Sequence, residues 1–344
     1  MANTTLCTRN FHDLREISPL RRNAAAISWG CVVCAAAIYA PHAVAQSYPT
    51  KAIRMVVAVT PGGSTDVVAR IVTQKMADLL AQRFIVDNRP GAGSIVGSDI
   101  VAKAAPDGYT LLFAMATHIT TPSLYSKLPF NTEEDFQAIS LLATQPLVII
   151  VNPQVPVRSI KELITLAKAK PGQLNYGLNA TGSAGHVAAE MFKLMTGTEI
   201  VAVAYKGAAP SNLALASNEV QLIFANVLSG ITMGKSGKAV VIGVASEKRM
   251  PQLPDVPTFS EQGIPSFDVA PWQGIVGPKG MPRTVVVALN RAAAESVRSS
   301  DVIEKLLATG STPIGGTPEE LDARIKSQLK SWGEVIRKAG MHVN

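Results

Sequence analysis

The sequence predicts an α/β protein with two lobes, because short apolar runs alternate with segments of helical spacing in two successive series. The first series places strands at residues 53–59, 84–88 and 110–115 and helices at residues 65–80 and 94–104. The pattern starts again after Pro146, with strands at 147–151, 174–178, 200–205, 220–225 and 240–245 and helices at 159–169, 184–195 and 210–216. Two lobes explain this repetition more economically than one very wide sheet.

The βαβαβ order of the first series predicts a mostly parallel sheet with helices on both faces. From Pro282 onward the chain is chiefly helical, and Thr317 followed by Pro318 is a good start for its last long helix. We expect these C-terminal helices to pack on the first lobe. The predicted boundaries are 46–147 together with 271–344 for the first lobe and 148–270 for the second.

The first 45 residues have the character of a cleaved export signal. Four arginines precede an uncharged stretch at residues 24–40, and Ala43-Val44-Ala45 then supplies the small-x-small pattern that a signal peptidase recognises. A membrane anchor is the alternative, but the stretch is shorter than the roughly 20 apolar residues that a spanning helix needs. We therefore expect a mature protein that begins at Gln46 and resides in the periplasm.

The composition of the mature part argues against several classes of function. All three cysteines lie in the leader, so the mature part has no disulfide, no thiolate nucleophile and no thiolate metal site. The leader also holds four of the 32 Lys and Arg residues and two of the 25 Asp and Glu residues, which leaves 28 basic against 23 acidic residues. Because this surplus is spread along the chain, it does not indicate nucleic-acid binding. No histidine pair or carboxylate cluster has metal-ligand spacing, and we expect no cofactor.

The first candidate site is the loop where the first strand meets its helix. It reads Pro61-Gly62-Gly63-Ser64-Thr65-Asp66 and combines two glycines with hydroxyl groups and unpaired N–H donors at a helix start. Such a helix end attracts anions. The loop lacks the Gly-Lys-Ser/Thr ending of a nucleotide P-loop, which favours a carboxylate over a polyphosphate. Simple capping of the helix by Thr65 or Asp66 is the structural alternative.

A second loop of the same kind is expected in the second lobe. Residues Asn179-Ala180-Thr181-Gly182-Ser183-Ala184-Gly185-His186 again join a strand to a helix with small, polar and flexible residues. If both helix N-termini point at one cleft, their positive dipole ends can hold a carboxylate without a dedicated arginine. For His186, a packed or surface position on the first helical turn is the alternative.

Several short motifs are spread along the chain from about Tyr48 to the C-terminus. They are Tyr48-Pro49-Thr50-Lys51, Pro61-Gly62-Gly63 with Thr65-Asp66, Asp87-Asn88-Arg89-Pro90-Gly91-Ala92-Gly93, Ala105-Pro106-Asp107-Gly108-Tyr109-Thr110-Leu111-Leu112, Tyr205-Lys206-Gly207 and Leu253-Pro254-Asp255-Val256-Pro257-Thr258. In order and spacing they resemble the substrate-binding proteins of tripartite tricarboxylate transporters, also called the Bug family. This resemblance is more specific than any single glycine motif.

The resemblance implies a type II periplasmic-binding-protein fold, in which two lobes joined by crossing strands close over an organic acid. It implies that the two loops surround the ligand carboxylate through backbone N–H groups, hydroxyls and ordered waters, which would let related proteins accept different acids. The predicted ligand residues are Pro61, Gly62, Gly63, Ser64, Thr65 and Asp66 from the first loop and Asn179, Thr181, Gly182, Ser183 and His186 from the second. Further contributors from nearby strand ends are Ala116, Thr117, His118, Tyr205, Lys206 and Asn226.

The chain departs from the family pattern at a few positions. The family often has Phe-Asp-Asn where Phe224-Ala225-Asn226 stands, so Ala225 removes an expected carboxylate. It also tends to have proline and phenylalanine at Ala58 and Val59, and a further proline at Thr60. These differences concern the rim of the site and the identity of the ligand more than the location of the site.

The resemblance also implies the partners. A monomer would deliver its acid to the large and small membrane subunits of an ion-coupled permease. The acid stays open among di- and tricarboxylates, acidic amino acids and aromatic carboxylates, because the predicted anchor recognises a single carboxylate.

An exported serine hydrolase is the competing class of function. The run from Thr181 to Gly185 looks superficially like a nucleophile elbow, with Ser183 as nucleophile and His186 and Asp66 as possible partners. However, the glycine two residues before Ser183 is missing, and His186 follows Ser183 by only one helical turn. We therefore favour a binding protein that performs no chemistry on its ligand.

Overall fold

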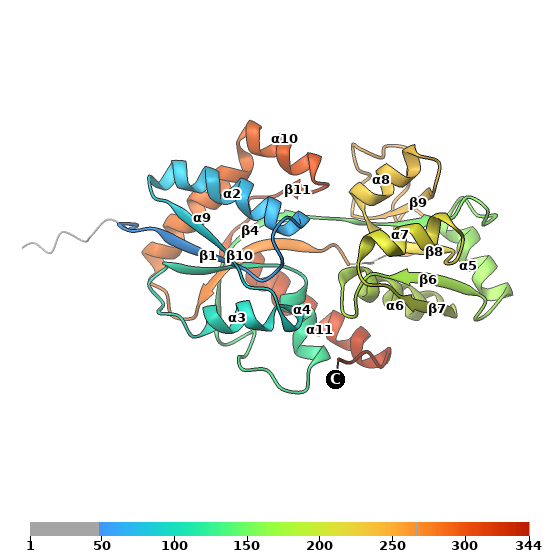
Figure 1. Cartoon of the computed structure of the whole chain (residues 1–344), viewed down its shortest axis with the longest axis horizontal. Coiled ribbons are helices and arrows are strands. Elements are labelled where there is room, and N and C mark those ends of the chain that lie inside the picture. The colour runs from blue at the N-terminus through green and yellow to red at the C-terminus, as the bar shows by residue number, and fades with distance from the viewer. Residues whose placement is uncertain (1–47, 266, 268, 344) are drawn as a thin grey trace, which may run out of the picture. The chain divides into compact units, whose positions relative to one another are not determined.

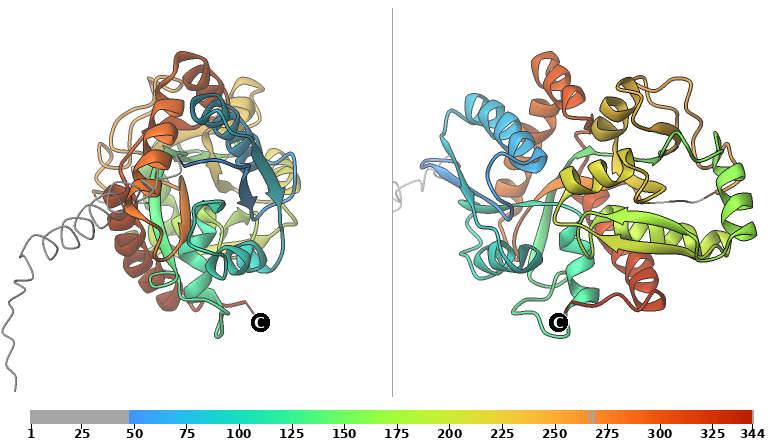
Figure 2. Two further views of the ribbon diagram at one scale, coloured as in Figure 1. Left: turned by 90° about the vertical axis from the view of Figure 1, so that its left-hand side faces the viewer. Right: turned by 45° about the vertical axis from the view of Figure 1, so that its right-hand side comes forward.

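The computed structural model describes residues 48–265, 267 and 269–343 (Figure 1). The predicted leader, residues 1–45, lies outside the described residues. Within the described part, the strands form two sheets, and each sheet has helices on both of its faces (Figures 1 and 2). None of the described helices combines the length and the apolar character that a bilayer span requires.

The first sheet contains six strands among the described residues. Their order is β11 (Thr312–Pro313), β4 (Phe136–Thr144), β10 (Trp272–Pro278), β3 (Thr110–Ala114), β1 (Ile53–Val57) and β2 (Phe84–Asn88). On one face lie α2 (Ser64–Leu80), α9 (Arg283–Arg298) and α10 (Ser300–Ala308). On the other lie the short 3₁₀ turn η1 (Ala92–Ser94), α3 (Ile95–Ala102), α4 (Thr117–Leu124) and α11 (Pro318–Lys338).

The second sheet contains five strands among the described residues. Their order is β7 (Ile200–Ala204), β6 (Leu174–Leu178), β8 (Leu222–Asn226), β5 (Leu147–Val151) and β9 (Val240–Ala245). Helices α7 (Ala208–Ala216) and α8 (Val227–Lys235) cover one face, and α5 (Ile160–Ala169) and α6 (Ala184–Thr196) cover the other.

Strand β5 illustrates why the strands carry long apolar runs. Val148 and Ile150 pack on the α7 and α8 side, whereas Ile149 and its neighbours pack on the α5 and α6 side. Since successive side chains of a strand point to opposite faces, a strand that is covered on both sides must be apolar at every position.

The predicted parallel pairing of the first three strands is confirmed, but both sheets also contain antiparallel pairs. β1 is parallel to β2 and β3, and β6 is parallel to β7 and β8, but β10 runs antiparallel to β3 and β4, and β5 runs antiparallel to β8 and β9. β5 and β10 are the strands with which the chain enters a sheet after leaving the other one. They start at the edge where their neighbours end, and this reverses their direction.

These crossings bring the carboxyl edges of the two sheets together. β4 ends at Thr144, and β5 begins at Leu147, which pairs with Asn226 at the carboxyl end of β8. On the return, Trp272 at the start of β10 pairs with Thr144. The three-residue step from Thr144 to Leu147 spans at most about 11 Å. The edge of the first sheet from which α2 and α4 begin therefore lies close, at the crossing, to the edge of the second sheet from which α6 and α8 begin.

The expectations for the C-terminal segment are confirmed. Thr317 accepts a hydrogen bond from the Glu320 amide, and the Glu320 carboxylate accepts one from the Thr317 amide, so α11 starts with a complete capping box. Helices α9 and α11 pack on β4 of the first sheet, and α11 also contacts α4 and α6.

Candidate functional site

The first predicted loop is held in place by a carboxylate of its own helix. Asp66, which is only 2 % exposed, accepts hydrogen bonds from the Gly62 amide at 2.9 Å, from Arg70 Nε at 3.0 Å and from Asn88 Nδ2 at 2.9 Å. Burial alone would raise the pKa of Asp66, but the hydrogen bonds from Arg70, Gly62 and Asn88 outweigh it and lower the pKa below its usual value. Asp66 therefore supports the loop, and its oxygens already have partners.

Free donors remain at the start of α2. Gly63 is the N-cap and offers no side chain to cap the helix. Val67 is the first residue of this turn whose amide has an acceptor, namely the Gly63 carbonyl. Within the described residues, the amides of Ser64, Thr65 and Asp66 have no acceptor. The Thr65 hydroxyl lies 3.9 Å from Met115 Sδ, which joins this loop to the segment between β3 and α4.

The second loop is built on the same plan. Residues 180–183 form a turn closed by the Ser183 amide and the Ala180 carbonyl, and Ser183 Oγ caps α6 by accepting from the His186 amide at 3.3 Å. His186 is 8 % exposed, and its Nδ1 accepts the Gly182 amide at 3.2 Å. The donors left without an acceptor among the described residues are the amides of Ala184 and Gly185.

One contact joins the second loop to the first sheet's helices. Gly182 lies against Leu124 at the end of α4, where an added Cβ would be 2.1 Å from Leu124 Cδ1. Helix α4 is in turn fixed to the η1 turn, because Thr117 Oγ1 and Ser94 Oγ are 2.8 Å apart and the Thr121 hydroxyl donates to the Gly93 carbonyl at 2.9 Å. The structure thus brings both loops into contact with the segment 115–124.

The predicted contributors at the start of α4 offer few free donors. The amides of His118 and Ile119 donate to Met115 and Ala116, and the Thr117 hydroxyl is engaged by Ser94. The His118 ring is buried edge-on against Phe136, with neither nitrogen hydrogen-bonded among the described residues. Burial lowers the pKa of His118 to about 4, so the ring is neutral at physiological pH.

The remaining predicted residues differ in whether their polar groups are free to bind a ligand. The Tyr205 hydroxyl donates to Glu219 beyond the far end of α7, so this side chain runs away from the helix N-termini. Asn226 caps α8 by accepting from the Ser229 amide at 2.8 Å. Asn179 Oδ1 is buried without a partner among the described residues, whereas Lys206 is exposed and makes no ion pair within the described chain.

Sequence reasoning missed the free amides of Ala184 and Gly185 and the role of Leu124. A general signal for the amides existed, since the first residues of any helix lack intrahelical acceptors. No sequence signal pointed to Leu124, because its contact with Gly182 depends on the packing of α4.

The groups of the competing hydrolase hypothesis are not assembled. His186 Nδ1 is engaged by Gly182, Ser183 Oγ accepts from a backbone amide, and Asp66 is bonded to Arg70, Asn88 and Gly62. These bonds do not join the three side chains into a relay. The described residues also contain no cluster of three or more side chains suited to holding a metal ion.

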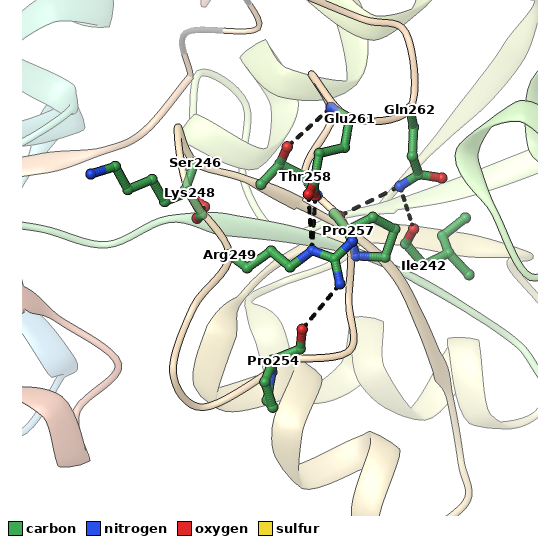
Figure 3. Close-up of polar contacts among 9 residues, drawn as sticks. All are labelled: Ile242, Ser246, Lys248, Arg249, Pro254, Pro257, Thr258, Glu261 and Gln262. Atoms are coloured by element: carbon green, nitrogen blue, oxygen red, sulfur yellow. Dashed lines mark hydrogen bonds and ion pairs between the residues drawn. The ribbon is translucent and has the colours of Figure 1, made fainter.

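A separate cavity of about 870 Å³ lies at the crossing between the sheets. Its lining includes Thr144, Pro146 and Ala270 from the crossings, together with Lys248, Arg249 and Arg324, and none of the predicted ligand residues. Arg249 donates to both oxygens of Glu261 at 3.0 Å and to the Pro254 carbonyl, while Lys248 points away from this cluster (Figure 3). Because no helix N-terminus lines this cavity and Arg249 is already neutralised, it is a poorer carboxylate anchor than the two loops.

Comparison with known proteins agrees with this architecture. A family model described as "Tripartite tricarboxylate transporter family receptor" matches residues 68–341. Protein BugT of Bordetella pertussis is 36 % identical over 313 residues, which cover 90 % of this chain and 96 % of that protein.

Solved structures extend the likeness to the fold. R. palustris Rpa4515 with adipate is 33 % identical with a TM-score of 0.74, over 86 % of this chain and all of that one. MatC from Rhodopseudomonas palustris with bound malate is 29 % identical with a TM-score of 0.70, over 84 % of this chain and all of that one. The predicted two-lobed α/β fold of periplasmic binding proteins is thereby confirmed.

Proposed function

Since the chain belongs to the family of tripartite tricarboxylate transporter receptors, we propose that it captures a small dicarboxylate and performs no chemistry on it. One carboxylate is held between the N-termini of α2 and α6. The observation that carries this proposal is the set of unpaired amides at each helix start, Ser64, Thr65 and Asp66 on α2 and Ala184 and Gly185 on α6. Such amides and the helix dipoles favour an anion.

The ligand class rests on the chemistry of the loops and on the relatives. Backbone amides recognise a carboxylate without fixing the rest of the acid, and two structural relatives hold adipate and malate, both dicarboxylates. The exposed ammonium of Lys206, two residues after β7, is suited to a second carboxylate. Tricarboxylates, acidic amino acids and aromatic carboxylates are the alternatives to be tested beside these two acids.

The wider setting is inferred from the family. We infer that residues 1–45 are removed on export and that the monomeric protein works in the periplasm. It would deliver its ligand to a large and a small membrane subunit. We place the lobe boundaries so that 46–147 and 271–344 form one lobe and 148–270 the other. Mass spectrometry of the protein recovered from the periplasm would test the cleavage after Ala45.

Proline substitutions test the amide anchor directly. Ser64→Pro and Ala184→Pro each remove one N–H at the first position of a helix, where proline is well tolerated. The preceding residues have the extended backbone that proline requires, with ψ of 163° at Gly63 and 157° at Ser183. Each variant should weaken binding of malate or adipate, measured by calorimetry, by about tenfold or more, since hydrogen bonds to charged groups are strong.

Two further variants test whether the loss of affinity is specific to these two helix starts. Ser300→Pro is the matched control, because Ser300 starts α10 after an extended Ser299 with ψ of 140°, and it should leave affinity unchanged. Lys248→Gln should also leave affinity unchanged if the ligand avoids the cavity at the crossing. Loss of binding in Lys248→Gln together with unaffected Ser64→Pro and Ala184→Pro variants would overturn the proposed site.

A further inference from the structure

The two loops share an internal hydrogen bond of the same span. In each, a glycine with positive φ donates its amide to the side chain four residues later, on the first turn of the following helix. Gly62 donates to Asp66 Oδ2 at 2.9 Å with φ of +85°, and Gly182 donates to His186 Nδ1 at 3.2 Å with φ of +74°. The loops thus differ in the chemistry of the acceptor, a carboxylate in one and an imidazole in the other.

The acceptor in the second loop fixes one state of the ring. Nδ1 can accept a hydrogen bond only when it carries no proton, so the neutral ring must carry its proton on Nε2. Protonation of the imidazole would place an N–H on Nδ1, facing the Gly182 amide. Two donors cannot share a hydrogen bond, so the turn would have to open or the ring would have to rotate.

Neither adjustment is easily made in this position. Gly182 is buried against Leu124, and the Gly182 amide has no other acceptor among the described residues. A buried amide without a partner is costly. The turn that Gly182 belongs to leads directly to Ala184 and Gly185, whose amides form half of the proposed anchor.

Burial, rather than the neighbouring charges, favours the neutral form of the His186 ring. The Tyr176 ring on β6 lies 6.5 Å away, and its hydroxyl donates to Glu190 Oε1 at 2.8 Å. Glu190 and Lys193, on the same helix as His186, form an ion pair with each other at 2.9 Å. Burial lowers the pKa of His186 below its usual value, Glu190 opposes this effect and Lys193 adds to it.

We propose that His186 is a positioning residue that holds the Gly182 turn in its ligand-binding form only while its imidazole is neutral, so that ligand capture weakens as the medium becomes acidic. This inference rests on the proposed function for its effect on affinity. The first loop lacks this sensitivity, because hydrogen bonds from Arg70, Gly62 and Asn88 hold the pKa of its acceptor, Asp66, below the usual value of a carboxyl group. On acidification, the second loop should therefore lose its ligand-binding form before the first loop does.

The binding experiment compares three variants of the purified protein between pH 7.5 and pH 5, with malate and adipate as probes. His186→Asn keeps an acceptor at the position of Nδ1 but does not titrate, so it should bind like the wild type at pH 7.5 and hold its affinity better on acidification. His186→Leu lacks the acceptor and should bind about tenfold more weakly at pH 7.5. His342→Asn alters an exposed histidine and should match the wild type throughout.

Protonation of the acid itself affects all variants equally, so the ratio of wild-type to His186→Asn affinity isolates the contribution of the ring. We expect this ratio to fall as the pH is lowered from 7.5 to 5. A constant ratio would overturn the pH dependence.

A ligand-free measurement keeps the inference independent of the identity of the acid. Deuterium exchange of the segment 179–185, compared among variants at one pH, should be about tenfold faster in His186→Leu than in the wild type, and unchanged in His186→Asn and His342→Asn. Equal exchange in the wild type and His186→Leu would overturn the role of His186. If neither acid binds the wild type, the proposed ligand class fails while the exchange rates still decide this role.

Discussion

Leu124 packs against Gly182 so closely that a Cβ on this glycine would lie 2.1 Å from Leu124 Cδ1. Gly182→Ala should therefore lower the free energy of unfolding by about 2–3 kcal/mol, because Leu124 must move and alanine must adopt φ of +74°. Gly172→Ala is the control, since Gly172 has φ of +71° but nothing within 4 Å of an added Cβ, and it should cost only about 1 kcal/mol. If urea unfolding showed the same loss of unfolding free energy in Gly182→Ala and Gly172→Ala, the tight contact with Leu124 would be contradicted.

Asp66 is expected to act as the support of the first loop. Asp66→Asn keeps the shape of the side chain but cannot accept from Gly62, Arg70 and Asn88 together, so the free energy of unfolding at pH 7 should fall by about 2 kcal/mol. Because the folded-state pKa of Asp66 is below its usual value, this stabilisation is complete above that value and disappears as pH falls through the folded-state pKa. Asp322→Asn, on an exposed ion pair, should change stability little.

His118 makes stability depend on pH. Its pKa is near 4 in the folded protein and 6.5 in the unfolded chain, so the unfolded state takes up a proton first as pH falls below 6.5. The free energy of unfolding should then decrease between pH 6.5 and pH 4, by up to roughly 3 kcal/mol from this residue.

His118→Leu provides the check on that dependence. In chemical unfolding measured at several pH values, the variant should lose less stability than the wild type between pH 6.5 and pH 4. The residual slope should be reduced further by His186→Asn, whose wild-type histidine also has a lowered pKa. An unchanged slope in His118→Leu would show that this ring titrates normally.

Ser183 should behave as a helix cap. Ser183→Ala is expected to lower the free energy of unfolding by about 1 kcal/mol, and Ser159→Ala, which removes the equivalent cap from α5, should cost a similar amount. A fluorophosphonate reagent for active serines should label neither the wild type nor these variants. Specific labelling of Ser183 would instead support a hydrolase.

Much of the fold was predictable because local patterns determine it. The predicted bounds of β2, β5, β6 and β9 coincide with the observed ones, since apolar runs bounded by turn residues mark buried strands. The sequence did not reveal β10 or α4. β10 contains Gly274, Gly277 and Pro278 and depends on long-range antiparallel pairing, and α4 is rich in threonine and contains Pro122, so both lack local propensity.

The candidate site was predictable only in part. Glycine-rich loops at strand ends located both helix starts, but which amides remain free depends on side-chain positions. Gly62 and Gly182 were predicted to contact the ligand, yet their amides donate to Asp66 and His186. The choice of these partners follows from rotamers and burial, which no local sequence pattern specifies.

A crystal structure of the protein with malate or adipate tests the central claim most directly. We predict one carboxylate between the start of α2 and the start of α6, with its oxygens within hydrogen-bonding distance of an amide of Ser64 or Thr65 and an amide of Ala184 or Gly185. An acid bound instead beside Lys248 in the cavity at the crossing, with both helix starts unoccupied, would contradict the account.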